Sequence, residues 1–518
     1  MNSTVMIEKN AYYDSVTLMS LSGSIGKQEG VEQGIVSMAT GMNKELLENI
    51  GMLTEEAMAA TENDLIIAVK ATTQALVDEV IASVKEQLNA KKASKNSSKE
   101  QIAKTLPTAL EILPDANIAV ISVRGDFAAR EARQALKAGL HVMIFSDNVT
   151  VEEEKELKEL GRDAGLLVMG PDCGTAIINQ VGLCFANQVR QGKIGLVAAS
   201  GTGLQEVTVQ IDHLGYGISQ AIGVGGRDLS EEIGGIMMLE GLKALDKDPQ
   251  TEVIVLISKP PAASVEEKIM AQIKQTKTPV VVCLLDGNEA PVKAAGATFA
   301  GTMNQAALAA IGVLTGNTVV GNEQDQSSVA WINEQKGKLT GSQKYIRGLF
   351  CGGTLTSEAL TVIRPSVDEI RSNVAKKSSE KVADIHLSVG HTLLDLGDDD
   401  FTVGKPHPMI EPSLRNERII QEAKDPATAV LLLDFELGYG SHDDPVGVTF
   451  ETLKEAGQIA EENGRHLSIV AYICGTRADK QDYDGQVEQL ESLGIFVAAS
   501  NEQAAGIATE LIKEGGAS

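Results

Sequence analysis

Residues 193–214 read KIGLVAASGTGLQEVTVQIDHL, and this stretch decides the fold class. It begins with an apolar run at 194–199, turns at the glycine-rich residues 200–203, and then repeats its apolar side chains at helical spacing up to residue 214. A short apolar run that leads through a glycine turn into an amphipathic helix is typical of a strand buried on both faces of a parallel sheet. The stretch therefore predicts an α/β protein with tight strand-to-helix turns.

The same order of elements returns later in the chain. Residues 345–351 form a second apolar run, residues 352–354 a glycine turn, and residues 355–363 a helical pattern. In addition, DPQTEV at 248–253 matches DPATAV at 425–430, and each leads into an apolar strand. Two matches in the same order indicate an internal repeat.

The remaining patterns divide the chain into several parallel-sheet domains of Rossmann or flavodoxin type and a small N-terminal α+β domain. In the N-terminal domain we expect strands at 15–19, 34–38 and 64–69 and a helix at 72–88. Further on, the run at 116–123 predicts a strand buried on both faces. The expected boundaries are an α+β domain at 1–90, a polar linker at 91–101, α/β domains at 102–190 and 191–316, a second linker at 317–342, and a last α/β domain at 343–518.

Composition excludes several classes of partner. The formal net charge of −26 would repel a nucleic-acid backbone. The five cysteines are widely spaced without a CxxC pair, which suits a reducing cytoplasm. No apolar run approaches the roughly 20 residues that a membrane helix needs, and no signal peptide is recognisable at the N-terminus. We therefore expect a cytoplasmic protein that binds neither nucleic acid nor membrane.

The two glycine turns are candidate phosphate sites. The first amide groups of a helix have no partner within the helix and carry the positive end of its dipole, so they attract anions. Glycine lets the backbone approach a ligand closely. Plain capping of each helix by a serine or threonine is the competing interpretation. The candidate phosphate-binding residues are Ser200, Gly201, Thr202 and Gly203 in the first turn, and Gly352, Gly353 and Thr354 in the second.

Two more loops follow predicted strands. Gly225 and Gly226 follow the strand at 218–224, where open α/β sheets bind ligands. Asp172 and Cys173 follow the strand at 166–169 and could face the same crevice, although a buried structural cysteine is the commoner case. These four residues are candidates for substrate binding.

Two histidines are candidate catalytic groups. His407 lies between two prolines and could donate a hydrogen bond to an oxyanion; a purely structural role is the alternative. His442 lies in the acidic segment 434–444, which could perform acid–base chemistry, hold a metal, or simply be a solvated loop. No P-loop, HExxH, GxSxG or Rossmann glycine motif stands in a convincing setting, so the sequence specifies no metal site and no certain cofactor.

These motifs resemble a known enzyme. From about residue 114 to 308 the chain resembles the α-subunit of succinyl-CoA synthetase, and from about 345 to 508 it resembles the carboxy-terminal ligase domain of that enzyme's β-subunit. The shared motifs are GPDC at 170–173, SGT at 200–202, GVGG at 223–226 and DPQTE at 248–252. The resemblance implies a CoA-binding-like domain at 102–190 and ligase-like domains at 191–316 and 343–518.

The chain also departs from the synthetase. That enzyme relays phosphate through a histidine in a Gly-His-Ala-Gly loop, whereas this chain reads KAAG at 293–296, with Ala294 in place of the histidine. Residues 1–90 replace the early glycine loop that binds CoA, and no ATP-grasp domain is recognisable. The departures rule out a phosphohistidine relay and put CoA binding in doubt.

The whole pattern, including the N-terminal domain, resembles the FdrA family of acyl-CoA-synthetase-like proteins. The resemblance implies a carbamoyltransferase that works with two other protein subunits in allantoin catabolism and converts oxalurate and phosphate to oxamate and carbamoyl phosphate. Phosphate or carbamoyl phosphate is then the expected ligand of the glycine turns. The alternatives are an unusual acyl-CoA ligase and a non-catalytic scaffold subunit.

Overall fold

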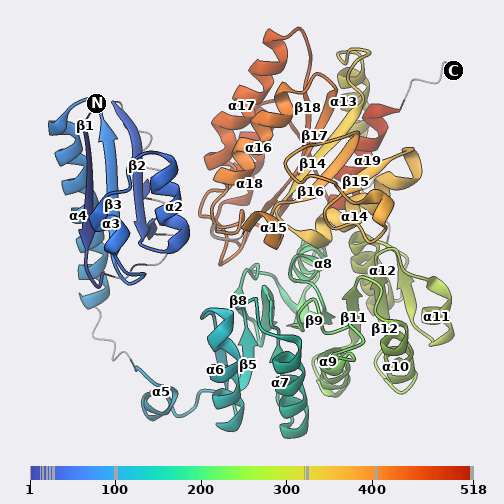
Figure 1. The fold of residues 1–518 in the computed structure, drawn as a ribbon. Coiled ribbons are helices and arrows are strands. Elements are labelled where there is room, and N and C mark those ends of the chain that lie inside the picture. Colours follow the sequence, from blue (N-terminus) through green and yellow to red (C-terminus); the bar gives the residue numbers. More distant parts are fainter. Residues whose placement is uncertain are drawn as a thin grey trace. The chain divides into compact units, whose positions relative to one another are not determined.

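The computed structural model describes residues 2–513 apart from 12, 14–16, 19–20, 23–24, 26–27, 29, 98–102, 320, 322–325 and 403–405. The chain forms two compact units (Figure 1). Unit 1 comprises residues 1–112 with 403–406, and unit 2 comprises residues 113–402 with 407–518.

Unit 1 is a small α+β domain. Its antiparallel sheet has the order β1-β3-β2, with β1 at Asn2–Glu8, β2 at Val31–Met38 and β3 at Leu65–Ala71. Apolar side chains of β3 are buried on both faces of the sheet, where they join two separate core clusters. The helices of unit 1 are α2 at Gly41–Asn49, α3 at Glu55–Ala59, α4 at Gln74–Ser97 and α5 at Leu106–Ile112.

Two expectations for the N-terminal region are wrong. The segment at 15–19 is not a strand in its described part, because Thr17 and Leu18 are helical. Leu18, Leu21 and Ile25 recur at helical spacing and are buried in one core cluster, so their burial favours helix. The expected linker at 91–101 continues α4 as far as Ser97, because its alanines and lysines favour helix and it contains neither glycine nor proline. Residues 98–101 lie outside the described part of the chain.

Unit 2 opens with a parallel three-stranded sheet of order β4-β5-β6. Its strands are β4 at Ile118–Ile121, β5 at His141–Ile144 and β6 at Val168–Met169, linked by α6 at Gly125–Lys137 and α7 at Val151–Ala164. The expectation that the run at 116–123 is buried on both faces is wrong, since Val120 is 50% exposed. The reason is position: β4 is the edge strand of this sheet.

A seven-stranded sheet follows, with the order β13-β12-β11-β9-β10-β7-β8. The hairpin of β7 and β8 is antiparallel and joins this sheet, although both strands precede residue 190, where we expected the domain boundary. The strands are β7 at Thr175–Ile178, β8 at Val181–Cys184, β9 at Gln191–Ala198, β10 at Ile218–Gly223, β11 at Val253–Ser258, β12 at Val280–Leu284 and β13 at Thr298–Ala300. The helices are α8 at Gly201–His213, α9 at Ile236–Lys247, α10 at Ala263–Ile273, α11 at Glu289–Ala294 and α12 at Met303–Thr315.

The last domain contains a parallel six-stranded sheet of order β15-β16-β14-β17-β18-β19. Its strands are β14 at Tyr345–Phe350, β15 at Ile370–Ser372, β16 at His391–Asp395, β17 at Thr428–Glu436, β18 at Ser468–Cys474 and β19 at Phe496–Ala498. The helices are α13 at Gln326–Lys336, α14 at Gly353–Ile363, α15 at Asp399–Thr402, α16 at Ser413–Lys424, α17 at Gly447–Glu462, α18 at Tyr483–Ser492 and α19 at Asn501–Ile512.

The two large sheets are structural repeats. The order β10-β9-β11-β12-β13 is 2-1-3-4-5 when it is counted from β9, and β16-β14-β17-β18-β19 has the same order when the additional edge strand β15 is left out of the count. This is the flavodoxin-like order, which binds ligands at the carboxyl ends of the strands near the first and third strands. We refer to the domain of β9 as the first repeat and to the domain of β14 as the second repeat.

The segment at 317–342 is not only a linker. It contains α13, which packs against α19. The ring of Trp331 lies 5.3 Å from that of Phe496, and its indole nitrogen donates to the carbonyl oxygen of Gly494 at 3.3 Å. Burying these apolar side chains holds the segment on the second repeat, which its polar composition did not reveal.

The core of unit 2 runs through both repeats. A single cluster of buried side chains includes Leu204 and Ile311 of the first repeat and Leu355 and Leu511 of the second. Helix α8 contacts α14, and α12 contacts α19, so the helices of the two repeats form one layer between the sheets (Figure 1). In the described part of the chain, no helix has both the length and the apolar character needed to cross a bilayer.

Candidate functional site

The structure brings the two predicted glycine turns together. Helix α8 begins directly after β9, and α14 begins directly after β14, so each starts at the carboxyl end of the first strand of its repeat. A Cβ atom on Gly352 would lie 2.6 Å from Cγ2 of Thr202, and one on Gly203 would lie 3.1 Å from Cγ2 of Thr354. The hydroxyl oxygens of Ser200 and Thr354 are 2.5 Å apart. Glycine is therefore required where the two helix starts meet.

The start of α8 is partly capped by its own side chain. Oγ of Ser200 accepts a hydrogen bond from the amide of Gly203 at 3.0 Å. The amides of Gly201 and Thr202 have no acceptor among the described residues. Oγ1 of Thr175 is buried without a hydrogen-bond partner, and it lies 3.7 Å from the position that a Cβ atom on Gly201 would take. Two helix amides and an unpaired buried hydroxyl thus lie at one point.

The start of α14 faces a carboxyl group instead. Gly352 provides no side-chain cap, and Oδ2 of Asp395 lies 2.6 Å from the position of a Cβ atom on Gly353. Asp395 is 7% exposed, and its Oδ1 accepts from the amide of Gly397 at 2.9 Å. Burial, and then the charges of Asp398 and Asp434, raise the pKa of Asp395 to about 7, while Lys259 opposes the shift. Asp395 therefore takes up or releases a proton near neutral pH.

A buried cluster of charged groups lies behind the second turn. The amide of Cys351 donates to Oδ1 of Asp434 at 2.9 Å. Nη1 of Arg415 donates to Sγ of Cys351 at 2.9 Å and to Oδ1 of Asp434 at 3.1 Å. Cys351, Asp434 and Glu436 are close enough together to hold a metal ion, but Arg415 already supplies a positive charge there. Burial and the Asp434 charge raise the pKa of Glu436, so it retains its proton.

The two predicted catalytic histidines have different surroundings. Nδ1 of His407 accepts from the amide of Met409 at 3.2 Å, and its Nε2 contacts Gly397, two residues after Asp395. Burial lowers the pKa of His407 to about 4, so the ring is neutral and its Nε2–H is a donor. The imidazole of His442 makes a local contact, in which its Nδ1 accepts from the amide of Asp444 at 3.0 Å, while its backbone amide donates to the carbonyl oxygen of Met409 at 2.8 Å. The structure thus places His407 beside the second turn and His442 next to the loop that contains His407.

The predicted substrate loops pack against each other. Gly225 has a φ of +84° and lies against the carbonyl oxygen of Pro171, whereas Gly226 faces open space. Cys173 is 2% exposed, and burial raises its pKa to about 12, so its thiol is not a nucleophile. Burial and the charges of Asp147 and Asp399 raise the pKa of Asp172 to about 6.

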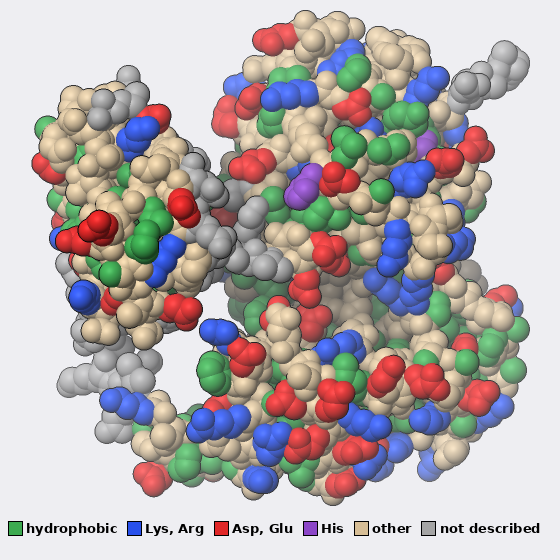
Figure 2. Space-filling view, viewed as in Figure 1, with side chains coloured by type: hydrophobic (Ala, Val, Ile, Leu, Met, Phe, Trp, Pro, Cys, Tyr) green, Lys and Arg blue, Asp and Glu red, His purple; other side chains and the backbone are tan. Residues whose placement is uncertain are grey.

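A hollow lies where the two halves of unit 2 meet in Figure 2, with Asp and Glu side chains on one side and Lys and Arg side chains on the other. The charge interaction of Asp172 with Asp399 crosses from the loop after β6 to α15 of the second repeat. Lys259, which follows β11, interacts in turn with Lys376 of the second repeat. Three cavities of about 420, 460 and 490 Å³ lie away from the helix starts, and the one of 460 Å³ is lined by Arg190, Tyr439 and Arg477.

Two buried glutamates were not predicted from the sequence. Glu206 and Glu358 are each the sixth residue after the N-cap of α8 and α14, within a pattern GTxxxE that occurs in both repeats. Glu358 accepts from the amide of Met303, which begins α12 of the first repeat, at 2.6 Å. Glu206 accepts from the amide of Asn501, which begins α19 of the second repeat. Each repeat therefore caps the last helix of the other, and the shared GTxxxE pattern was the signal that could have revealed it.

This glutamate pair is also electrostatically strained. Burial raises the pKa of Glu206 to about 7, and burial together with the charge of Glu206 raises the pKa of Glu358 to about 8. Asp395 and Lys259 were missed as well. Each follows an apolar strand, but nothing in the sequence indicates that strands of different repeats end at the same place.

Comparison with known proteins agrees with this architecture. The family model "CoA-ligase" matches residues 349–511, and "CoA binding domain" matches residues 189–287. The second match falls on the first repeat, whereas we expected a CoA-binding-like domain at 102–190. The model "AllF, heavy metal-associated domain" matches residues 1–104. The fold and these matches define a succinyl-CoA synthetase-like protein with CoA-ligase-like repeats.

The chain is 48% identical over 515 residues to the uncharacterized protein YahF of Escherichia coli (strain K12), covering 99% of both chains, and it belongs to the same family. It is 28% identical over 185 residues to the α-subunit of succinate–CoA ligase from Methanothermobacter thermautotrophicus, and 29% identical over 184 residues to an α-subunit of that enzyme from Trichomonas vaginalis. The matches cover 61% and 58% of those subunits.

Two solved structures are similar at low identity. PH0766 from Pyrococcus horikoshii OT3 is 17% identical, with 77% of this chain and 84% of that chain covered and a TM-score of 0.31. ATP citrate lyase from Methanothrix soehngenii is 16% identical, with 63% and 58% covered and a TM-score of 0.37. Similarity at this level carries no information on function.

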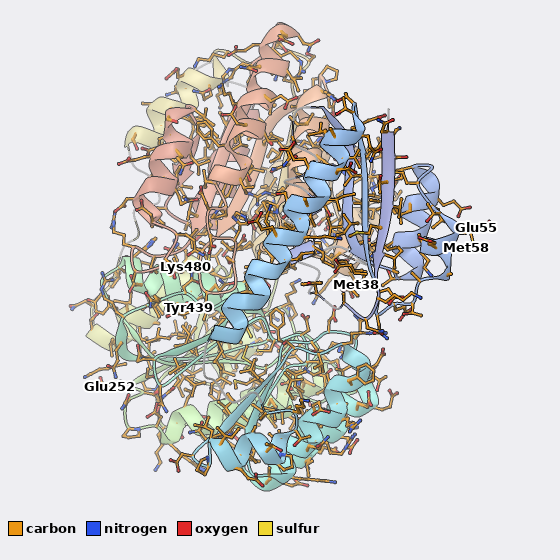
Figure 3. All side chains as sticks on the ribbon, turned by 90° about the vertical axis from the view of Figure 1, so that its left-hand side faces the viewer. Met38, Glu55, Met58, Glu252, Tyr439 and Lys480 are labelled. Carbon is orange, nitrogen blue, oxygen red and sulfur yellow. The ribbon has the colours of Figure 1, made fainter. Side chains whose placement is uncertain are left out.

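The residues of unit 1 do not fit a heavy-metal site. The chain contains no histidine before His141 and no cysteine before Cys173, so residues 1–112 lack the imidazole and thiolate ligands that such metals prefer. Met38 and Met58, both labelled in Figure 3, lie on different elements. Met38 is 8% exposed at the end of β2, whereas Met58 is 61% exposed in α3, so their thioethers do not share one environment.

Proposed function

We propose that this chain is a subunit of an oxamate carbamoyltransferase, which converts oxalurate and phosphate to oxamate and carbamoyl phosphate in allantoin catabolism. The proposal includes two further protein subunits, as the resemblance to the FdrA family implies. The observation that carries it is the meeting of two helix starts from the two repeats, with free amides and hydroxyls at one point. The AllF family match over residues 1–104 is consistent with it.

Phosphate would bind at the start of α8. The amides of Gly201 and Thr202 and the unpaired hydroxyl of Thr175 are suitable donors for an anionic oxygen. The amide of Gly203 is already bonded to Ser200, so its contribution is to let Thr354 approach closely. The start of α14 is less suited to phosphate, because the Asp395 carboxyl group lies against Gly353.

The chemistry needs a phosphate beside a carbonyl carbon. An oxygen of hydrogenphosphate attacks the terminal carbamoyl carbon of oxalurate, and negative charge develops on the carbonyl oxygen. The Nε2–H of neutral His407 and the hydroxyl of Thr354 are the donors in this region that could stabilise the oxyanion. His442, whose backbone amide donates to the carbonyl oxygen of Met409, is a second candidate in this region for proton transfer.

An acyl-CoA ligase is less well supported. Ala294, which stands where the synthetase carries its histidine, is exposed at the end of the short helix α11 and cannot carry a phosphoryl group. We therefore propose that this chain does not run the phosphohistidine relay of the synthetase.

The test is an assay of the native complex, co-purified with its partners, for carbamoyl phosphate formed from oxalurate and phosphate. Replacing both Thr202 and Thr354 with valine is expected to raise the KM for phosphate by at least about tenfold, since two hydroxyls are lost from the site. Thr361→Val, two turns further along α14, is the matched control. Unchanged kinetics in the double variant would remove the phosphate assignment, and an inactive wild-type complex would favour the scaffold alternative.

A further inference from the structure

Two ionisable side chains from different repeats, Asp395 and Lys259, lie at the carboxyl ends of their sheets and interact through their charges. Asp395 ends β16, which pairs with β14, and Lys259 directly follows β11, which pairs with β9. All four strands are parallel within their sheets, so both residues lie at the carboxyl edges where open α/β sheets bind ligands. The opposing charges of Lys259 and Asp395 act on the pKa of both groups.

The Asp395 carboxyl group is directed at the first turn of α14. Its Oδ2 lies closer to Gly353 than any side-chain atom of that residue could tolerate, at 2.6 Å from the position of a Cβ atom. Its Oδ1 accepts from Gly397, but Oδ2 has no hydrogen-bond partner among the described residues. The carboxyl group therefore has an oxygen beside a helix start whose hydrogen-bonding capacity a ligand can use.

The charge of Lys259 interacts with the Asp395 carboxyl group. The side chain of Lys259 is half-buried, and burial lowers its pKa, while Asp395 and Asp398 raise it and Lys376 lowers it. Nζ of Lys376 donates to the carbonyl oxygen of Pro260, the residue after Lys259, at 3.3 Å. This bond connects the segments that follow β11 and β15, and it brings a second positive charge to the site.

We propose that Asp395 is the acid that protonates the leaving nitrogen of the carbamoyl donor, and that Lys259 binds the carboxylate of that donor. The proposal rests on the proposed function, whose substrate oxalurate is an acylated urea with a terminal carboxylate. The amides at α8 hold the phosphate, so the two repeats supply different parts of one reaction.

The proton and electron balance closes without another reactant. An oxygen of hydrogenphosphate forms a bond to the carbamoyl carbon, and the bond from that carbon to the inner nitrogen breaks. The electron pair of the broken bond stays on nitrogen, which takes the proton of Asp395 and leaves as the amide group of oxamate. The hydrogenphosphate proton then returns to Asp395, so carbamoyl phosphate dianion and oxamate are formed.

The state of Asp395 fits this role. Its pKa of about 7 leaves a large protonated fraction at neutral pH, and its ionised form can accept a proton in the reverse direction. The groups that face it are Lys259, Asp398, Asp434 and the amide of Gly397. A simple helix cap would serve only as an ionised acceptor, which is the alternative that the experiment separates.

The experiment measures both directions of the reaction in the native complex. Asp395→Asn keeps the shape of the side chain and is expected to lower kcat about 100-fold in both directions, with the KM for phosphate changed less than about threefold. The reverse rate of the wild type, from carbamoyl phosphate and oxamate, should rise with pH through about 7, and Asp395→Asn should lose this limb. The reverse direction is chosen because inorganic phosphate itself titrates near neutral pH.

Lys259→Met should raise the KM for oxamate at least about tenfold with little change in the KM for carbamoyl phosphate, and Lys259→Arg should restore part of the affinity. Asp400→Asn, an exposed carboxylate nearby, is the control and should behave as wild type. A melting temperature for each variant shows whether it is folded.

The outcomes separate the two proposals. An inactive wild-type complex overturns the proposed function, and this inference with it. An active wild type whose Asp395→Asn variant keeps its kcat and its pH limb overturns only the role of Asp395. If Asp395→Asn loses activity but Lys259→Met binds oxamate normally, the role of Asp395 as the acid is supported, and the proposal that Lys259 binds the substrate carboxylate is overturned. If the loss of activity is matched by a loss of melting temperature and the pH limb persists, Asp395 is a structural cap.

Discussion

The starts of α8 and α14 occupy equivalent places in the two repeats but differ in their capping residues and in the side chains that lie against them. At α8, Ser200 caps Gly203 and leaves two amides beside the unpaired hydroxyl of Thr175. At α14, the cap residue is Gly352, and the Asp395 carboxyl group lies against the first turn. One turn therefore offers only donors, whereas the other brings an acid.

The difference shows how two copies of one fold can present different chemical groups at equivalent positions. The backbone of each repeat produces a helix start that attracts negative charge. A single side chain from a neighbouring strand then decides whether that start remains available to an anion. The two starts touch through Thr202 and Thr354, so the donors of one repeat and the acid of the other lie close together, as the proposed reaction requires.

The largest effect is expected behind the second turn. Arg415→Met leaves the buried Asp434 without its positive partner, which should lower the free energy of unfolding by about 3–5 kcal/mol. Urea unfolding of the variant and the wild type measures this. The described residues around the first turn contain no such cluster. If Arg415→Met lowers the free energy of unfolding by less than about 1 kcal/mol, the buried cluster does not stabilise the second turn more strongly than the first turn is stabilised.

Gly353→Ala should come next. Its Cβ atom would lie 2.6 Å from Oδ2 of Asp395, so the carboxyl group or the turn must move. We expect the rate of carbamoyl phosphate formation to fall about 100-fold, as a displacement of catalytic groups by about 1 Å can produce. Gly506→Ala in α19 faces open space and is the control; it should retain activity and gain about 0.5–1 kcal/mol of stability. Equal behaviour of both variants would contradict the close packing at α14.

The glutamate pair should make stability fall as the pH rises. The pKa values of about 7 for Glu206 and about 8 for Glu358 lie above the ordinary value of 4.5. Between pH 4.5 and these raised values, the folded state therefore binds more protons than the unfolded state. Their contribution is complete below pH 4.5 and is lost as the pH rises through 7 and 8.

Melting temperatures from pH 5 to 9 check this, with Glu358→Gln as the comparison. This variant removes the carboxyl group whose pKa is raised by burial and by the charge of Glu206, so it should flatten the profile. A wild-type melting temperature that rises over this interval would show that the two carboxyl groups ionise freely in the folded protein.

The smallest effect is expected at the first turn itself. Ser200→Ala removes the cap of Gly203, which should cost about 1 kcal/mol of unfolding free energy. Its hydroxyl also contacts Thr354, so the mutation tests how strongly the two helix starts are coupled. A double-mutant cycle with Thr354→Val measures that coupling, and strict additivity would indicate that the two turns act independently.

Local patterns predicted most of the α/β elements correctly. The strands expected at 194–199, 218–224 and 345–351 lie within or beside β9, β10 and β14, because continuous apolar runs are stable only when buried in a sheet. The incorrect predictions concern segments whose burial depends on which other elements pack against them. Residues near Leu18 are helical because three of their apolar side chains join one core cluster, and β4 is exposed because no strand pairs with its outer edge.

The candidate site was predicted in part for the same reason. The glycine turns could be found because a helix start has the same donors in any α/β protein. The charge interaction of Lys259 with Asp395, the reciprocal caps of Glu206 and Glu358, and the charge of Arg415 beside Cys351 could not be predicted. Each depends on residues far apart in the chain, and their separation in sequence does not reveal their separation in space.

The sequence by itself determined the α/β class, the duplication and the position of two anion-attracting helix starts, because these follow from local periodicity and backbone chemistry. Only the tertiary structure decided that the starts touch, that Thr175 lies unpaired beside one and that Asp395 lies against the other. The physical reason is that hydrogen bonding and charge act over a few ångströms in space, and only the packed repeats bring these groups within that range.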